Sequence, residues 1–402
     1  MTNERTRQAN RPVVDMGELS DYAGPSRLVR VEPGERTLTV TWDDGATGRF
    51  HHIWLRDHCP CSACRHPQTH ERTFALIDLP ADLPAPHAEI TGDGALRLQW
   101  PAMPGFDRHE SLFDPGWMRQ RASLDGPAAD AGPKQHWDAS IASAIPRVTH
   151  GAFMHTGEGV SDWLQALDRY GFVLLDQGPC DDEEVLRVAG RVGWPRETNF
   201  GRMFDVVSKP DPNNAAYTAA ALEPHVDLPN WQRPPDFQLL YCLANEAKGG
   251  GSLLTDGFAV AEALRREDPA GLELLATQPV DFRFQDEGAD IACCAPVIGR
   301  DADGRLTEIR FNNWIRDSLR IPGEHVEGFY RAYRRFWQLL RDPAFALRFT
   351  LQPGQAIAFD NLRVLHGREA FDPNTGYRRL QGAYLDRDPI RSRLRVLERQ
   401  AA

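Results

Sequence analysis

Three potential metal ligands, carried by two segments far apart in the sequence, constrain the fold most strongly. His225 and Asp227 are separated by one residue, and His366 follows a short apolar run, residues 356–359, much later in the chain. In an extended segment, side chains two residues apart project from the same face, so His225 and Asp227 can reach one metal ion. Two imidazoles and one carboxylate form the facial triad that holds non-haem iron(II) and leaves other coordination positions open. The fold must therefore bring both segments together on rigid elements.

An arginine lies at a suitable distance beyond the third potential ligand. Arg378 comes twelve residues after His366 and is followed by the apolar-rich stretch 380–385. A guanidinium group can bind a carboxylate through two parallel hydrogen bonds. Arg378 is therefore a candidate for anchoring a dicarboxylate beside the iron.

The cysteines indicate a second metal site. Three of the seven cysteines, Cys59, Cys61 and Cys64, fall within six residues, which does not fit a disulfide framework in a chain of this size. The C-x-C-x2-C spacing can place three thiolates around a tetrahedral zinc ion, whose fourth ligand must come from elsewhere. By local chemistry that ligand could be one of several histidines: His58, His66, His70 or a later one. Four protein ligands would make the zinc structural, and the alternative is three reduced thiols that bind nothing.

Length and charge narrow the class of protein. A chain of 402 residues exceeds the size that one core usually serves, so we expect two domains. The net charge of −11 argues against nucleic acid as a partner. No apolar run approaches the ~20 residues that cross a bilayer, and the first twelve residues are polar, so we expect a cytoplasmic protein without a membrane partner.

The pattern changes twice along the chain. We predict a flexible N-terminus over residues 1–24, a small β domain over 25–122 that zinc would stabilise, and a linker rich in Gly, Ala, Pro and Asp over 123–140. Residues 141–402 mix short strands with helices, the longest expected at 324–341 with a stripe of aromatic residues that we interpret as core. A hairpin is expected between 293–298 and 306–311. Periodicity alone favours an α+β fold with much antiparallel sheet.

Several motifs, in this order and spacing, resemble those of the γ-butyrobetaine dioxygenase family of Fe(II)- and 2-oxoglutarate-dependent oxygenases, which also includes trimethyllysine dioxygenase. They are residues 54–64, 214–218, 225–227, 249–258, 359–366 and 382–384. The resemblance runs from about residue 27 to the C-terminus. It implies a double-stranded β-helix, or jelly roll, as the catalytic domain, in addition to the zinc-binding N-terminal β domain.

The resemblance also implies roles for individual residues. It selects His109 as the fourth zinc ligand, and it assigns His225, Asp227 and His366 to Fe(II). Arg378, rather than the neighbouring Arg379, matches the family's arginine for 2-oxoglutarate. With O2, such an enzyme would convert 2-oxoglutarate to succinate and CO2 while it hydroxylates its substrate, and ascorbate would keep the iron reduced.

Substrate recognition is implied to depend on an aromatic cage. A quaternary ammonium group has no hydrogen to donate, so aromatic faces bind it through cation–π attraction. The family's cage residues match Phe200, Phe204, Tyr217 and Tyr384, with Asn214 for the substrate carboxylate, although each ring could instead belong to the core. The resemblance favours hydroxylation of γ-butyrobetaine at carbon 3 to L-carnitine. The alternatives are trimethyllysine, 2-trimethylaminoethylphosphonate, or a non-catalytic barrel that binds a metabolite, and the family expectation is a homodimer.

Overall fold

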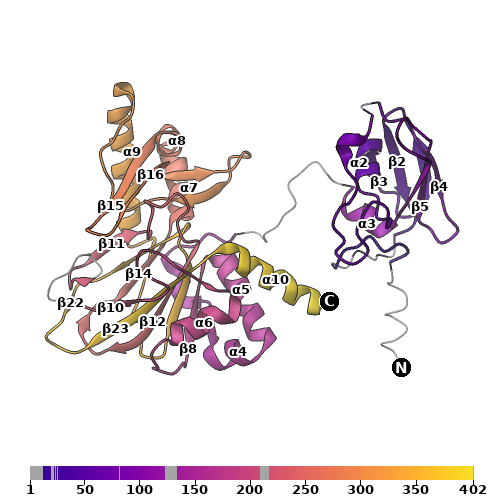
Figure 1. Cartoon of the computed structure of the whole chain (residues 1–402). Helices are drawn as coiled ribbons and strands as arrows, with labels where there is room; N and C mark the ends of the chain where they lie inside the picture. The colour runs from indigo at the N-terminus through magenta and orange to yellow at the C-terminus, as the bar shows by residue number, and fades with distance from the viewer. Residues whose placement is uncertain are drawn as a thin grey trace. The chain divides into compact units, whose positions relative to one another are not determined.

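The computed structural model describes residues 12–19, 22, 24, 26–80, 82–122, 134–208 and 217–401. The chain divides into two compact units, Met1–Ala129 together with the last two residues, and Asp130–Gln400; Figure 1 colours the elements of each by residue number. The domain boundaries expected from composition, at 25–122 and 141–402, stay predictions. Among the described residues, no helix is both long and apolar enough to cross a membrane.

The first unit contains two three-stranded antiparallel sheets. One has the order β1-β2-β3 and the other β4-β5-β6. Their strands are β1 (Leu28–Pro33), β2 (Thr37–Trp42), β3 (Thr47–His51), β4 (His87–Ile90), β5 (Leu96–Trp100) and β6 (His109–Phe113). Two short helices, α2 (His52–Asp57) and α3 (Pro115–Gln120), and the 3-10 turn Leu76–Asp78 complete the unit. Trp42 and Trp100 are buried in its core because alternate residues of β2 and β5 face inward, and Trp117 of α3 is buried with them.

The first unit lies between the two segments that composition predicts to be flexible, the N-terminus 1–24 and the linker 123–140. Met16 and Tyr22, within the stretch 1–24, have buried side chains in the core of this unit. Residues 1–11 and 123–133 lie outside the described residues. The remainder of the expected linker packs on the second unit, where the Trp137 ring lies 4.9 Å from that of Phe172. Residues that pack on each unit therefore occur within the segments that composition alone assigns to flexible chain.

Two sheets facing one another form the second unit. The larger has the order β10-β23-β12-β20-β8-β7, with β9 pairing with β23, and the smaller has the order β11-β21-β14-β19. The larger sheet consists of β7 (Arg147–Thr149), β8 (Phe172–Asp176), β9 (Pro195–Arg196), β10 (Phe204–Val206), β12 (Phe237–Asn245), β20 (Ala356–Asp360) and β23 (Arg378–Leu385). The smaller consists of β11 (Leu222–His225), β14 (Ser252–Asp256), β19 (Ala346–Phe349) and β21 (Val364–Arg368). This arrangement confirms the expected double-stranded β-helix.

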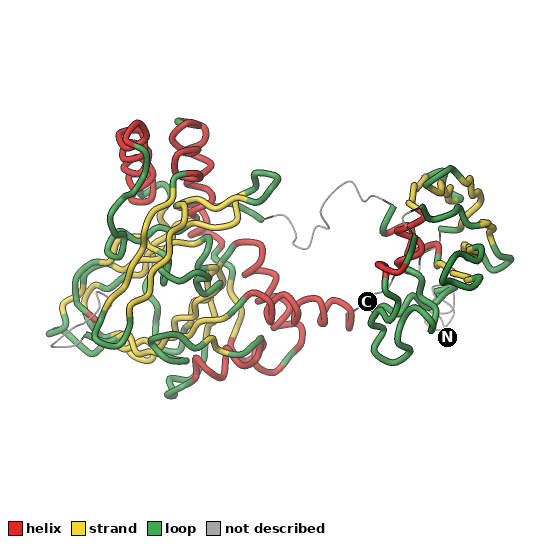
Figure 2. The backbone as a smooth tube through the Cα atoms, turned by 45° about the horizontal axis from the view of Figure 1, so that its top comes forward, coloured by secondary structure: helices red, strands yellow, loops and turns green. Residues whose placement is uncertain are grey.

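Helices cover the outer face of the larger sheet (Figures 1 and 2). They are α4 (His150–His155), α5 (Gly157–Tyr170), α6 (Glu184–Val192) and α10 (Arg387–Ala401). Strand β12 shows why both faces of this sheet are apolar: Leu239 packs among the helices, whereas its neighbours Leu240 and Cys242 pack between the two sheets. Helix α6 begins at Glu184.

A third group of elements packs beside the smaller sheet. It comprises α7 (Gly257–Glu267), α8 (Pro269–Thr277), α9 (Gly323–Arg341) and the hairpins β15 (Pro279–Gln285)–β16 (Asp290–Pro296) and β17 (Ile298–Arg300)–β18 (Leu306–Ile309). The aromatic stripe of α9 is buried here, as interpreted from sequence. The hairpin expected between 293–298 and 306–311 is wrong in part. Cys293 pairs with Phe282 in β15, and only residues from Ile298 onward pair with β18.

Candidate active site and metal centres

The two histidines of the predicted iron site stand directly opposite each other across β11 and β21. His225 and His366 are register partners, and their rings lie 4.3 Å apart. Asp227 follows immediately after β11, with its Oδ1 atom 3.3 Å from His225 Nε2 and 3.8 Å from His366 Nε2. The close approach of the strands needs a glycine, because a Cβ on Gly367 would lie 2.6 Å from the Leu222 carbonyl oxygen. The fold therefore brings together the three side chains that sequence reasoning grouped.

The backbone around Asp227 is fixed by one buried side chain. Asn361, in the turn between β20 and β21, is 0% exposed and accepts a hydrogen bond from the Asp227 N–H at 2.8 Å. Its Nδ2 group donates to the carbonyl oxygens of Asp227 and Pro235 at 2.9 and 3.0 Å. Leu228, the next residue, has a φ of 54°, a backbone conformation that residues other than glycine rarely adopt. Asn361 thus holds the Asp227 backbone in place.

Protonation states suit metal binding. His225 Nδ1 donates to the Glu223 carbonyl oxygen at 2.9 Å, which turns Nε2 toward Asp227. Burial, together with the neighbouring His225, lowers the pKa of His366 to about 3, so this ring is neutral. Burial raises the pKa of Asp227. The combined effect of His366, His225 and the Tyr384 hydroxyl lowers it by more, so the pKa is below its usual value and the group is a carboxylate. Two imidazoles and one carboxylate facing one point fit a divalent iron ion.

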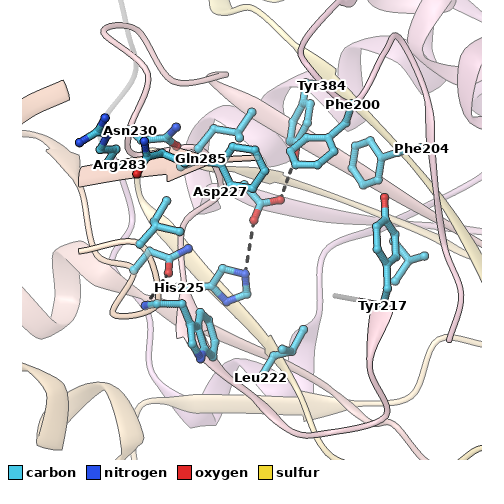
Figure 3. A pocket seen from close by; sticks show the side chains of 16 residues that line it. Phe200, Phe204, Tyr217, Leu222, His225, Asp227, Asn230, Arg283, Gln285 and Tyr384 are labelled. Atoms are coloured by element: carbon cyan, nitrogen blue, oxygen red, sulfur yellow. Dashed lines mark hydrogen bonds and ion pairs between the residues drawn. The ribbon is translucent and has the colours of Figure 1, made fainter. Parts of the chain in front are cut away.

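A cavity of about 380 Å³ opens beside these ligands, within the size range of small-molecule sites. Four aromatic residues predicted for the cage line it: Phe200, Phe204, Tyr217 and Tyr384 (Figure 3). The Phe204 ring lies 5.1 Å from that of Tyr384 and 6.4 Å from that of Phe200. Phe204 also lies against Gly382, whose added Cβ would come within 2.3 Å of the ring. We call these four residues the aromatic cluster; Asn214 lies outside the described residues.

The cavity also has walls that the sequence motifs did not identify. Strand β15 contributes Arg283, Phe284 and Gln285, and residues outside it include Asn230, Asn312 and Trp314. The Trp314 ring stands edge-on to the His225 ring at 5.0 Å and 85°. The sequence around these residues has no spacing typical of a metal or substrate site. The pairing of β15 with β16 and the packing of this hairpin against the smaller sheet bring them close to the metal ligands.

The two adjacent arginines of β23 face opposite sides of the sheet. Arg379 forms ion pairs with Asp205 at 2.8 Å and Asp182 at 2.7 Å. Arg378 is 8% exposed and lies on the inner side with Leu380 and Tyr384, where its guanidinium stacks 5.4 Å from the Phe371 ring. Its Nε has no hydrogen-bond partner among the described residues, and burial lowers its pKa. A buried cation without a carboxylate partner in the described part of the chain fits the binding of an anionic co-substrate.

The cysteine cluster of the first unit has tetrahedral spacing. The His109 Nε2 atom, at the start of β6, lies 3.2, 3.7 and 3.6 Å from the sulfur atoms of Cys59, Cys61 and Cys64. Zinc bonds of ~2.3 Å to sulfur and ~2.0 Å to nitrogen at tetrahedral angles separate such atoms by about 3.6 Å. Hydrogen bonds from Cys59, His109 and Arg56 lower the pKa of the Cys64 thiol. The four donors therefore fit a zinc ion.

The fold and the facial donor set together define a dioxygenase of the class that uses Fe(II) and 2-oxoglutarate. The chain belongs to the family described as taurine catabolism dioxygenase TauD, TfdA family, whose model matches residues 147–384. A second model, gamma-butyrobetaine hydroxylase-like, N-terminal, matches residues 29–119, which include the cysteine cluster.

Characterised relatives match almost the whole chain. The gamma-butyrobetaine dioxygenase of Pseudomonas sp. strain AK-1 is 42% identical over 366 residues, which cover 90% of this chain and 94% of the relative. The gamma-butyrobetaine dioxygenase of Homo sapiens is 30% identical, covering 91% and 96%. The trimethyllysine dioxygenase of Meyerozyma guilliermondii is 31% identical, covering 92% and 96%. The relatives therefore share both units.

Proposed function

We propose that this protein hydroxylates γ-butyrobetaine at carbon 3 to give L-carnitine, with release of succinate and CO2. The observation that carries the proposal is the placement of the aromatic cluster in the same cavity as His225 and Asp227. The identity to the Pseudomonas gamma-butyrobetaine dioxygenase, at 42% over 90% of the chain, supports the same substrate. A cavity that joins a cation-binding wall to an iron site suits a substrate with an ammonium group a few bonds from the reacting carbon.

Each group of residues has a separate task in this proposal. His225, Asp227 and His366 would hold the iron, which when bound supplies the activation of O2. Arg378 would bind the distal carboxylate of 2-oxoglutarate through a charge-assisted pair. The aromatic cluster would attract the trimethylammonium group at about 0.5 to 2 kcal/mol for each ring. The protein's contribution is to place one C–H bond near the metal and to exclude water.

The zinc ion proposed for Cys59, Cys61, Cys64 and His109 would be structural. All four positions around it are protein atoms, so it offers no site for substrate. It would hold the loop after α2 against the start of β6, in a unit with few hydrophobic layers. The homodimer and the cytoplasmic location stay predictions.

A second candidate is the same chemistry on another trimethylammonium compound, either trimethyllysine or 2-trimethylaminoethylphosphonate. Polar side chains, Asn230, Arg283 and Gln285, line the cavity on the side of Asp227 away from Phe204 and Tyr217 (Figure 3). A phosphonate needs more donors than a carboxylate, and this side supplies several. The Arg283 guanidinium already pairs with Asp290 at 2.6 Å, which favours the carboxylate substrate over the phosphonate.

A coupled assay tests the proposal. Purified protein with Fe(II), 2-oxoglutarate and ascorbate would be given γ-butyrobetaine, trimethyllysine and 2-trimethylaminoethylphosphonate in parallel, with succinate and product mass as readouts. We expect one succinate for each γ-butyrobetaine that gains one oxygen atom, and much slower turnover of the other two compounds. The Asp227→Ala variant serves as the control without a complete triad. Efficient turnover of another compound instead would refute the substrate, and no succinate from any compound would favour the non-catalytic barrel.

A further inference from the structure

One side chain belongs to both the aromatic cluster and the metal site. The Tyr384 ring lines the cavity beside Phe204, and its hydroxyl donates a hydrogen bond to Asp227 Oδ2 at 2.8 Å. The phenol is 3% exposed. Figure 3 shows this hydrogen bond from Tyr384, and on the other side of the Asp227 carboxylate the contact with His225. A residue that only lined the substrate pocket would not need this contact.

The hydrogen bond from Tyr384 gives the two carboxylate oxygens of Asp227 different partners. Oδ1 faces the two histidine Nε2 atoms, at 3.3 and 3.8 Å, whereas Oδ2 accepts the phenol hydrogen. Because Asn361 already fixes the Asp227 backbone, the hydrogen bond from the phenol restricts what is left, which is rotation of the side chain about its Cα–Cβ and Cβ–Cγ bonds. One oxygen is thereby left for a metal ion, with the coordination positions opposite the triad kept open.

We propose that Tyr384 is a positioning residue for the metal carboxylate and links the substrate site to the metal site. Its hydroxyl fixes Asp227 for coordination through Oδ1, while the face of the same ring receives the ammonium group. This inference rests on the proposed function for the identity of the substrate, but its metal part rests on the contacts of Asp227 alone. The metal ion would act on Tyr384 through Asp227, and the ammonium substrate would act on its ring. Binding of the metal and binding of the substrate are then coupled, and each changes the affinity for the other by the same factor.

Removing the hydroxyl alone separates the two tasks. Tyr384→Phe keeps the aromatic ring and deletes the donor to Asp227. We expect Fe(II) affinity, measured anaerobically by competition with a chromophoric chelator, to fall about 10-fold or more. We expect the KM for the ammonium substrate to change by less than about threefold, since tyrosine and phenylalanine rings are both cation–π partners. The visible absorption of bound Co(II) should also change, because the carboxylate can then turn and offer both oxygens.

Two further variants make the result specific. Phe204→Leu removes a ring of the aromatic cluster that does not contact Asp227, so it should raise the substrate KM and leave Fe(II) affinity unchanged. Tyr217→Phe deletes a second hydroxyl of the same cavity and should also leave Fe(II) affinity unchanged. The thermal midpoint of each variant without metal shows whether it is folded, and a Tyr384→Phe variant with altered packing would be replaced by Tyr384→Leu, which also lacks the donor and is compared for Fe(II) affinity alone.

The outcomes separate this inference from the proposed function. Unchanged Fe(II) affinity and an unchanged Co(II) spectrum in folded Tyr384→Phe would overturn the positioning role, whatever the substrate is. Equal losses of Fe(II) affinity in Tyr384→Phe and Tyr217→Phe would overturn it as well, because the effect would not depend on Asp227. If the metal results hold and γ-butyrobetaine is not turned over, the positioning role stands and the proposed substrate is wrong.

Discussion

The Asn361 side chain offers a sharp test of how the metal site is built. Its amide makes three hydrogen bonds with the backbone, two with Asp227 and one with Pro235. We predict that Asn361→Ala lowers both the stability of the second unit and its affinity for Fe(II). The substitution removes these bonds, so the N–H of Asp227 and two carbonyl groups lose the partner that a fully buried side chain gave them.

The structure sets the size of the effect. Each hydrogen bond contributes about 1 kcal/mol net, and a buried backbone group without a partner adds a further cost, so the total is about 3 to 5 kcal/mol. For a unit of this size, 1 kcal/mol shifts the thermal midpoint by about 2 to 4 °C, which gives a fall of roughly 10 °C. Fe(II) affinity should fall about 10- to 100-fold, since contacts that orient a ligand typically have effects of that size.

Calorimetry without metal and an anaerobic Fe(II) titration provide the measurements. Asn374→Ala is the matched control, because Asn374 also lies in a turn beside a strand, and its hydrogen bonds among the described residues go to Asp372 at the surface. It should change stability by less than about 0.5 kcal/mol. The reasoning fails if Asn361→Ala melts within 2 °C of the unchanged protein and binds Fe(II) equally well.

Two other predictions concern the 2-oxoglutarate site and the first unit. Arg378→Lys should raise the KM for 2-oxoglutarate about 10-fold or more, because a lysine cannot make the paired contact. Arg379→Lys alters ion pairs near the surface and should change this KM less than twofold, so equal effects of the two substitutions would contradict the assignment of Arg378 to 2-oxoglutarate. Cys61→Ser should lower zinc content below one ion for each chain and reduce the thermal midpoint of the first unit, because zinc stabilises only the folded form; full zinc content with an unchanged midpoint would contradict the Cys3His site.

The sequence predicted the parts of the site that depend on local geometry. His225 and Asp227 lie two residues apart at the end of a strand, and this spacing alone places both on one face. The spacing of Cys59, Cys61 and Cys64 likewise identified a cluster that the structure closes with His109. The resemblance to a family, rather than periodicity, supplied the jelly roll, because short strands buried on both faces lack an alternating pattern.

The remaining features depend on contacts between distant segments. Trp314 reaches His225 only because the segment after β18 folds back over the cavity. The inward direction of Arg378 and the outward direction of Arg379 follow from the register of β23 with β12, and a shift by one residue would exchange them. The hairpin at Cys293 was mispredicted because the apolar run 291–298 contains the end of one hairpin and the start of the next. No local pattern contains this information.

The pairing of His225 with His366 has a consequence for the whole catalytic unit. A metal ion bound to both would act as a removable cross-link between strands ~140 residues apart in the chain, and because it binds only the folded form it would stabilise that form by about 2.7 kcal/mol at a free metal concentration 100 times the Kd. The cross-link forms only when β11 and β21 pair in this register. The stability of the catalytic unit would then rise with the concentration of free iron.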